Sequence, residues 1–185
     1  MKKSSYNKKF SKLMIVAHPD DELIFGGAEL IKNKDYKVIC ITNQNNPKRL
    51  KEFTGLMKDL KVSYEILDHP DNMNTKNVKT DYINHIDNII KNNLSKLTKI
   101  VTHNNKGEYG HNFHKAVSKM VTELCKKYNI IDKLYYFGKG KTRIEKDLII
   151  KKLELMEKYY PSQYKVLARL NLQNDIEKES FKKAI

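Results

Sequence analysis

Two short segments of the chain are rich in side chains that bind metals or transfer protons. The first, at 17–22, reads AHPDDE and combines an imidazole with three consecutive acids. The proline after His18 disfavours helical backbone at the histidine, so we expect that imidazole at the tip of a strand. Because consecutive side chains point in different directions, Asp20 and Asp21 can take different roles, one as a metal ligand and the other as a base.

The second segment, at 102–114, reads THNNKGEYGHNFH. Gly107 and Gly110 predict a loop that runs into a helix. His111 and His114 lie three residues apart, so at the head of that helix both side chains project from one face. Both imidazoles can therefore reach the same small volume.

Together the two segments hold the donor set of a catalytic metal site. A catalytic zinc typically has three protein ligands and an open position for water, and His18, Asp21 and His114 supply two imidazoles and one carboxylate. Iron(II) uses a similar set. Zinc lowers the pKa of water to roughly 7, which predicts hydrolysis at neutral pH. Asp20 would take a proton from that water, and His111 would protonate the leaving amine or stabilise developing charge.

Each of these residues also has a purely structural interpretation. A lone His18 would more often be a core or capped histidine than a ligand, and the pair Asp20 and Asp21 suits the N-terminus of a helix. His111 and His114 could be a solvated pair on a helix surface. Their combination in two motifs, each directly after an apolar run, favours a site.

Alternating elements are predicted to position these segments. Short apolar runs bounded by polar residues predict five strands, at 12–17, 37–42, 62–67, 100–102 and 134–137. Helical patterns occupy 20–32, 47–60, 80–93 and 112–128. This alternation predicts an α/β fold, a Rossmann-like three-layer sandwich with a mostly parallel five-stranded sheet and helices on both faces. Helical patterns at 147–160 and after 162 predict a helical C-terminal extension, and the charged tail at 174–185 is expected to fray.

The predicted sheet explains how two distant segments could share one pocket. In doubly wound sheets, ligands bind beyond the carboxyl ends of the strands, near the point where strand order reverses. The AHPDDE segment follows the first predicted strand, and the histidine-rich segment follows the fourth. If those two strands are neighbours, the two segments face each other.

The bulk composition restricts the possible partners. A length of 185 residues predicts one domain over 1–185. The net charge is +14, but only three of the 36 basic residues are arginine, which argues against a specific nucleic-acid reader. Two well-separated cysteines suggest buried free thiols and a cytoplasmic or otherwise intracellular soluble location. No apolar stretch approaches the roughly 18 residues of a membrane span.

The two motifs resemble those of a known family. AHPDDE with a downstream G-H-x-x-H is similar to the PIG-L/LmbE family of zinc-dependent de-N-acetylases, whose members hydrolyse N-acetylglucosaminyl lipids, related glycoconjugates and some thiol conjugates. Arg49 and Glu52 form an R-x-x-E that the family often has, and YPSQ at 160–163 resembles the family's S-Q motif. The resemblance spans roughly 13–163 and implies the Rossmann-like fold predicted above.

The resemblance also implies roles for individual residues. It makes His18, Asp21 and His114 the ligands of Zn²⁺. It makes Asp20 the general base, His111 the second catalytic group, and Tyr109 a residue that helps to bind the oxyanion. His103 and Asn104 stand where eukaryotic members often have Phe-Asp, so the substrate of those members does not carry over.

Three further residues are candidates for substrate binding, and each has an alternative. Arg49 could grip a hydroxyl or phosphate group, or form an ion pair with Glu52 on its helix. His103 could line the pocket or close its strand, and Gln163 could contact substrate or cap the last helix. His69, followed by proline and an acid, echoes the first motif without its second acid, and we expect a surface turn there.

The predicted function is removal of the acetyl group from an N-acetylated amino sugar by metal-activated water. The carrier of the sugar is left open, with phosphorylated, nucleotide-linked and lipid-linked forms all compatible, as is the oligomeric state. The first alternative is a zinc amidase that acts on a non-sugar N-acyl conjugate. The second is a basic polyanion-binding protein with a vestigial metal site, which the lysine excess motivates.

Overall fold

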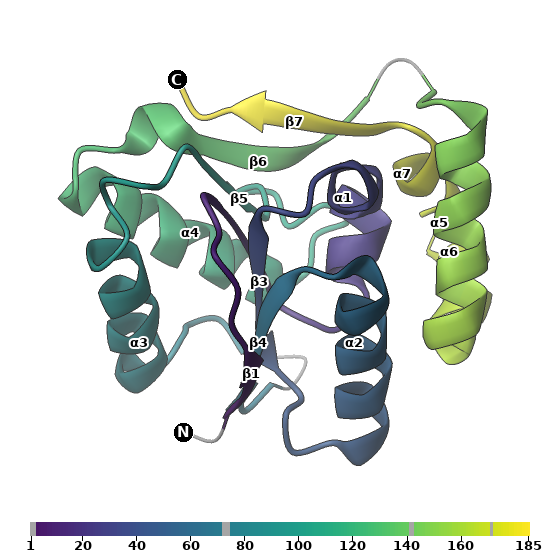
Figure 1. Ribbon diagram of the computed structural model, residues 1–185, viewed down its shortest axis with the longest axis horizontal. Coiled ribbons are helices and arrows are strands. Elements are labelled where there is room, and N and C mark those ends of the chain that lie inside the picture. The colour runs from purple at the N-terminus through teal and green to yellow at the C-terminus, as the bar shows by residue number, and fades with distance from the viewer. Residues whose placement is uncertain (1–2, 72–74, 141–142, 171) are drawn as a thin grey trace.

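A computed structural model describes residues 3–71, 75–140, 143–170 and 172–185. Within these residues the chain forms one mixed sheet of seven strands, in the order β1-β4-β3-β2-β5-β6-β7 (Figure 1). The strands are β1 Lys3–Tyr6, β2 Lys12–Val16, β3 Tyr36–Thr42, β4 Ser63–His69, β5 Lys99–Thr102, β6 Leu134–Lys139 and β7 Glu179–Lys183. The helices are α1 Asp21–Lys32, α2 Pro47–Leu60, α3 Thr80–Lys91, α4 Asn112–Lys127, α5 Lys146–Tyr159, α6 Pro161–Arg169 and α7 Gln173–Glu177, with a 3₁₀ turn at Ile131–Lys133.

The α/β fold predicted from the sequence is confirmed. The five predicted strands correspond to β2 to β6, and they pair in parallel across the centre of the sheet. Two antiparallel edge strands, β1 and β7, extend the predicted five to seven. Neither edge strand has an apolar pattern of its own, because β1 reads KSSY and β7 reads ESFKK. The tail that was expected to fray contains α7 and β7.

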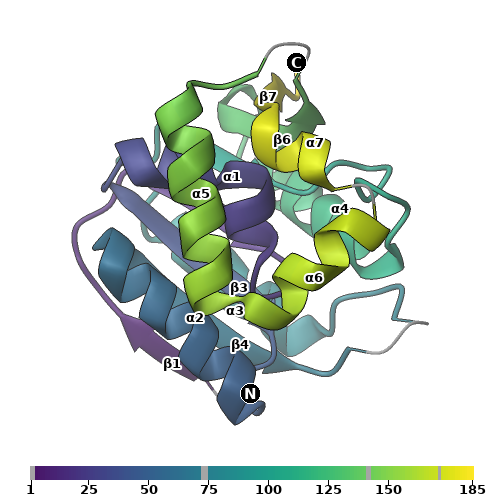
Figure 2. The same cartoon turned by 90° about the vertical axis from the view of Figure 1, so that its right-hand side faces the viewer.

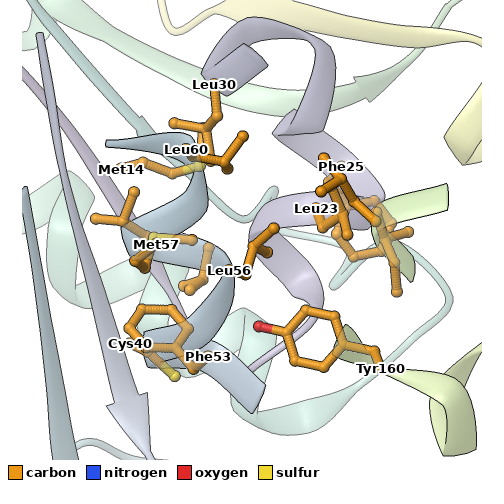
Figure 3. Close-up of a cluster of buried hydrophobic side chains, with 14 of the residues drawn as sticks. Met14, Leu23, Phe25, Leu30, Cys40, Phe53, Leu56, Met57, Leu60 and Tyr160 are labelled. Carbon is orange, nitrogen blue, oxygen red and sulfur yellow. The ribbon is translucent and has the colours of Figure 1, made fainter. Parts of the chain in front are cut away.

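Helices cover both faces of the sheet, and the alternation of strand side chains divides the core into two parts (Figure 1). On β2, Met14 and Val16 pack toward α1, α2 and α5, whereas Leu13 and Ile15 pack toward α3 and α4. Figure 3 shows the first part, in which Phe53, Leu56 and Met57 of α2 lie near Leu23 of α1 and Tyr160. Continuous apolar strands are expected where both faces of a parallel sheet are buried.

The point where strand order reverses lies at β2. This strand pairs in parallel with β3 on one side and with β5 on the other. The first and fourth predicted strands are therefore neighbours, as the shared-pocket hypothesis required. Loops at the carboxyl ends of β2 and β5 leave the sheet side by side, which is the usual place for a ligand in such folds.

The helical C-terminal extension packs against helices α1 and α2, on the side of the sheet that they cover. Figure 2 shows α5 in front of α1, with α6 continuing from its lower end and α7 at the upper right. Helix α6 begins with a proline directly after the buried Tyr160, a residue type that suits the first turn of a helix. Among the described residues, none of the helices combines the length and apolar character needed to span a bilayer.

Candidate functional site

Three metal-capable side chains converge at the carboxyl ends of β2 and β5. His18 follows β2, Asp21 opens α1, and His114 lies in the first turn of α4. His18 Nδ1 lies 3.2 Å from His114 Nε2 and 3.3 Å from Asp21 Oδ2. His114 Nε2 lies 3.4 Å from the same carboxylate oxygen. These three atoms form a nearly equilateral triangle.

Carboxylates on the far side of each imidazole fix where its proton lies. Asp71 Oδ2 lies 2.5 Å from His18 Nε2, and Glu108 Oε2 lies 2.7 Å from His114 Nδ1. A carboxylate accepts hydrogen bonds, so each of these nitrogens carries the proton. In neutral rings the nitrogens that face Asp21 then carry lone pairs. Against the opposing effect of burial, the hydrogen bonds to Asp21 and Asp71 raise the pKa of His18 to about 10, so a proton occupies its Nδ1 when no cation does. Such carboxylate partners are a general feature of metal-binding histidines.

With both rings neutral, as metal ligands must be, the triangle consists of three hydrogen-bond acceptors that face one another. Two lone pairs and a carboxylate oxygen at such distances repel unless a proton or a cation lies among them. Ligand atoms placed 2.0–2.1 Å from a tetrahedral zinc lie about 3.3–3.4 Å apart, close to the separations of His18, Asp21 and His114. The residues present thus fit a zinc ion.

A wider set of metal-capable side chains surrounds the triangle. Among the described residues, ligand atoms within 4.8 Å of one another form two overlapping groups: His18, His111 and His114, and Asp21, His103 and His114. His103 Nε2 accepts the backbone N–H of Ala17 at 3.0 Å, and its Nδ1 faces Glu108 at 2.9 Å. Because both ring nitrogens of His103 are already engaged, we do not count it among the ligands.

Asp20 lies beside the triangle in a strained backbone conformation. Its φ is 113°, in the region that favours glycine, and strain of this kind costs about 1–3 kcal/mol and is common at active sites. Asp20 occupies the N-cap position of α1, but its side chain makes no capping hydrogen bond. Burial and the neighbouring Asp21 charge raise the pKa of Asp20 to about 7, against the opposing effect of Arg49. A carboxylate with such a pKa suits a general base.

A buried network supports the backbone around Asp20. Arg49 reaches Asp20 Oδ2 at 3.2 Å, Glu52 Oε2 at 2.8 Å, and the carbonyl of Pro19. Glu22 accepts the Asp20 N–H at 3.1 Å, and its other oxygen accepts the Tyr160 hydroxyl at 2.6 Å. Burial raises the pKa of Glu22 to about 8. The R-x-x-E pair and the start of YPSQ thus converge on the strained residue.

His111 and Tyr109 approach the triangle from the β5–α4 loop. His111 is the N-cap of α4, and its Nδ1 accepts the Phe113 N–H at 3.2 Å, so a neutral ring carries its proton on Nε2. The His111 ring centroid lies 4.8 Å from that of His18 and 4.6 Å from that of His114. Tyr109 is 42% exposed, with its ring centroid 5.4 Å from that of His114.

A cleft of about 230 Å³ opens over this group of side chains. It brings together seven of the sequence-predicted site residues as lining: His18, Asp20, Asp21, Arg49, Tyr109, His111 and Gln163. His114 is buried beneath them, and His103 is buried and does not line the cleft. For His103 the geometry favours a structural role at the end of its strand over a role in lining the pocket. Arg49 both forms the ion pair with Glu52 and lines the cleft.

Sequence reasoning missed Asp71 and Glu108. The segment at 69–71 was interpreted as a surface turn, yet Asp71 orients His18, and His69 is only 3% exposed, so the prediction for His69 is wrong. His69 is buried because its ring stacks on Phe113 with centroids 4.9 Å apart. Glu108 lay inside the second motif, and its φ of 54° between Gly107 and Gly110 marks a tight loop. Its position in the sequence between His103 and His114, the two histidines that it contacts, was the signal that could have identified it.

Comparisons of the sequence with known proteins agree with this geometry. A family model described as GlcNAc-PI de-N-acetylase, or PIG-L, matches residues 13–125. An uncharacterized protein of Acanthamoeba polyphaga mimivirus is 36% identical over 184 residues, a match that covers 90% of this chain and 78% of that protein. The region matched by the family model includes both motifs.

Solved structures with the same fold include two deacetylases. The conserved protein TT1542 from Thermus thermophilus has a TM-score of 0.72 at 13% identity, covering 95% of both chains. A triple mutant of a deacetylase from the teicoplanin biosynthetic pathway has a TM-score of 0.67 at 16% identity, covering 89% of this chain and 88% of that one. The A40926 pseudoaglycone deacetylase Dbv21 has a TM-score of 0.65 at 14% identity, covering 87% and 85%. At these identities the likeness shows the shared fold.

Proposed function

The chain belongs to the GlcNAc-PI de-N-acetylase (PIG-L) family, and from this membership we propose that it is a zinc-dependent hydrolase that removes the acetyl group from an N-acetylated amino sugar. The family match supports a deacetylase. Zinc dependence and the sugar substrate are the parts that this proposal adds.

The observation that carries the proposal is the triangle of acceptors formed by His18, Asp21 and His114. Their ligand atoms lie 3.2–3.4 Å apart, and both imidazoles have a carboxylate partner on the opposite nitrogen. We propose these three residues as the metal ligands. The open side of the triangle faces the cleft, where a substrate carbonyl and a water molecule can enter.

The residues around the triangle match the steps of amide hydrolysis. A bound zinc ion would supply a Lewis acid and make water acidic enough to attack at neutral pH. Asp20 accepts the proton of the attacking water, which its pKa of about 7 permits. The proton that Asp20 has taken passes to the leaving amine as its bond to the carbonyl carbon breaks. The Nε2–H of His111 donates a hydrogen bond toward that amine and stabilises the developing charge, because its Nδ1 accepts the Phe113 N–H. Tyr109 is placed to donate to the developing oxyanion.

We assign substrate binding to the polar rim of the cleft. Arg49, Gln163 and Asn43 line it beside the proposed ligands. Amide and guanidinium groups suit sugar hydroxyls, and the guanidinium also suits a phosphate on the sugar. The substrate class that follows is an N-acetylglucosamine-type glycoconjugate. Cys40 and Cys125 are free buried thiols, which supports an intracellular location. That the chain forms a single domain stays a prediction.

Two substitutions test this proposal. We expect Asp20→Asn to keep one zinc per chain and to lose about 10²–10⁴-fold in kcat, because only the proton acceptor is removed. We expect His114→Ala to lose the metal itself. The measurements are acetate release from N-acetylglucosamine conjugates and metal content by mass spectrometry. An Asp20→Asn protein with a near-normal rate would refute the assigned base.

A further inference from the structure

The cleft has a second, apolar wall that removal of an acetyl group does not require. Five aliphatic residues line it together with the polar groups: Ile24, Val166, Leu167, Leu170 and Leu172. They come from α1, from α6 and from the residues just after α6. A sugar ring presents mainly hydroxyl groups, which an aliphatic wall cannot satisfy with hydrogen bonds.

The spacing of these residues makes the wall continuous. Gln163, Val166 and Leu167 follow one another at intervals of three and one residues, which places them on one face of α6. Leu170 continues this face just beyond the helix, because its N–H donates to the carbonyl of Val166 at 3.0 Å. Gln163 is the polar end of this face, and Leu170 is its exposed end, with 37% of its surface accessible. Tyr164 lies on a neighbouring face of α6 and lines a different cavity, which it shares with Leu167.

The wall begins next to the reacting centre. Ile24 lies one helical turn after Asp21 on α1, and both residues line the cleft. The leaving amine must lie toward His111, which comes from the β5–α4 loop. The other substituent of the carbonyl is the acyl chain, and it therefore extends away from His111.

We infer that the cleft binds N-acyl groups longer than acetyl, with the hydrocarbon chain lying against Ile24, Val166 and Leu170. This inference rests on the proposed function, because it requires the same centre to hydrolyse the amide. It adds the substrate class: an amino sugar that carries a linear N-acyl group, in which acetyl is the shortest substrate and medium-chain groups are preferred. Each methylene that the wall buries should raise kcat/KM about 4-fold.

The test uses the zinc-loaded protein and a series of N-acyl glucosamines with acetyl, butyryl, hexanoyl and octanoyl chains, scored by release of glucosamine. We expect kcat/KM to rise at least about 10-fold from acetyl to hexanoyl. An octyl glycoside of N-acetylglucosamine serves as a further arm, because it places the same alkyl chain on the sugar instead of on the acyl group.

Paired variants locate the effect on the wall. Val166→Thr combined with Leu170→Asn makes the wall polar and should flatten the dependence on acyl length. The matched control, Tyr164→Asn, removes a large side chain of similar exposure to Leu170 that does not line the cleft, and it should keep that dependence. Thermal unfolding of each variant verifies that the fold is intact.

The outcomes separate the inference from the proposed function. Hydrolysis of the acetyl substrate with no gain from longer acyl chains overturns the inference and leaves the deacetylase intact. A gain with the octyl glycoside alone assigns the wall to the carrier of the sugar and also overturns the inference. Absence of amide hydrolysis of every substrate, measured as glucosamine from the N-acyl glucosamines and as acetate from the octyl glycoside, contradicts the proposed function itself.

Discussion

Helix α1 contacts two buried clusters of charged side chains, and they differ in one respect. At its N-terminus lie the acceptors of His18, Asp21 and His114. About one turn further along lies the ion pair between Lys152 of α5 and Glu179 of β7, with 2.7 Å between Nζ and Oε2. In the ion pair every charge has a partner within the protein, whereas the acceptors at the N-terminus face one another.

The backbone of α1 supplies further hydrogen-bond partners for the Lys152–Glu179 pair, and we call this group the closed cluster. Lys152 also donates to the carbonyl of Ile24 at 3.0 Å, and Glu179 accepts the N–H groups of Ala28 and Glu29 at 2.8 and 2.9 Å. Gly27 permits this approach, because a Cβ there would lie 3.0 Å from a Lys152 side-chain carbon and closer still to Leu23. The side chain of Lys152 is fully buried, and that of Glu179 is 3% exposed.

The difference separates a structural cluster from a functional one. Burying a charge is costly unless it is paired and hydrogen-bonded, and the Lys152 cluster meets that condition with its own atoms. In the His18 cluster, Asp21 Oδ2 accepts the backbone N–H of His18 at 2.8 Å, but its three acceptor atoms still need a proton or a cation among them. We therefore assign stability to the first cluster and metal binding to the second.

The largest expected effect is on stability, through the closed cluster. Lys152→Met leaves Glu179 buried without its cation and should lower the free energy of unfolding by about 3–5 kcal/mol. Urea denaturation measures this change. Zinc bound per folded chain should stay unchanged, because the two clusters have no shared side chain.

The neighbouring Lys151 provides the control. Its ammonium pairs with Glu154 at the surface, where its side chain is 54% exposed, so Lys151→Met should cost at most about 1 kcal/mol. A Lys152→Met protein as stable as the Lys151→Met protein would show that the buried pair contributes no net stability. Loss of zinc from folded Lys152→Met would show that the clusters are coupled.

A smaller effect is expected from the carboxylate behind the metal site. Glu108 accepts from both His103 and His114, and Glu108→Gln should weaken zinc binding about 10–100-fold, because a carboxylate partner orients the imidazole and raises its basicity. Competition with a chelator measures the dissociation constant.

Glu123→Gln on the outer face of α4 is the matched substitution, since Glu123 is 60% exposed and pairs only with Lys126 among its described contacts. It should leave zinc affinity unchanged. If Glu108→Gln also leaves zinc affinity unchanged, the orientation of His114 does not depend on its carboxylate.

How much was predictable from the sequence differs between the two clusters. The functional cluster was largely predictable, because His18, Asp21 and His114 occur in compact motifs directly after predicted strands. The parallel order of β2 and β5 then brings the motifs together. The closed cluster was not predictable, because Lys152 and Glu179 lie in ordinary charged segments, and only tertiary packing buries them.

The supporting residues of the site show the same limit. Asp71 and Glu108 act through contacts with histidines that the fold supplies, 53 residues away along the chain for Asp71. Edge strands β1 and β7 escaped detection because their residues are mainly polar, and pairing with β4 and β6 is what makes them strands. The type of a residue and its position after a strand predicted the site, whereas the sequence alone did not reveal which distant residues would contact it.

Zinc titration of the metal-free protein tests the central claim most directly. Wild-type protein should bind one zinc ion per chain and melt at a higher temperature in its presence, because a ligand that binds only the folded state stabilises it. Asp21→Ala should lose both effects while Asp20→Asn keeps them. Equal zinc affinity in the wild-type and Asp21→Ala proteins, or no binding by the wild type, would contradict the claim that a cation binds among the three acceptor atoms.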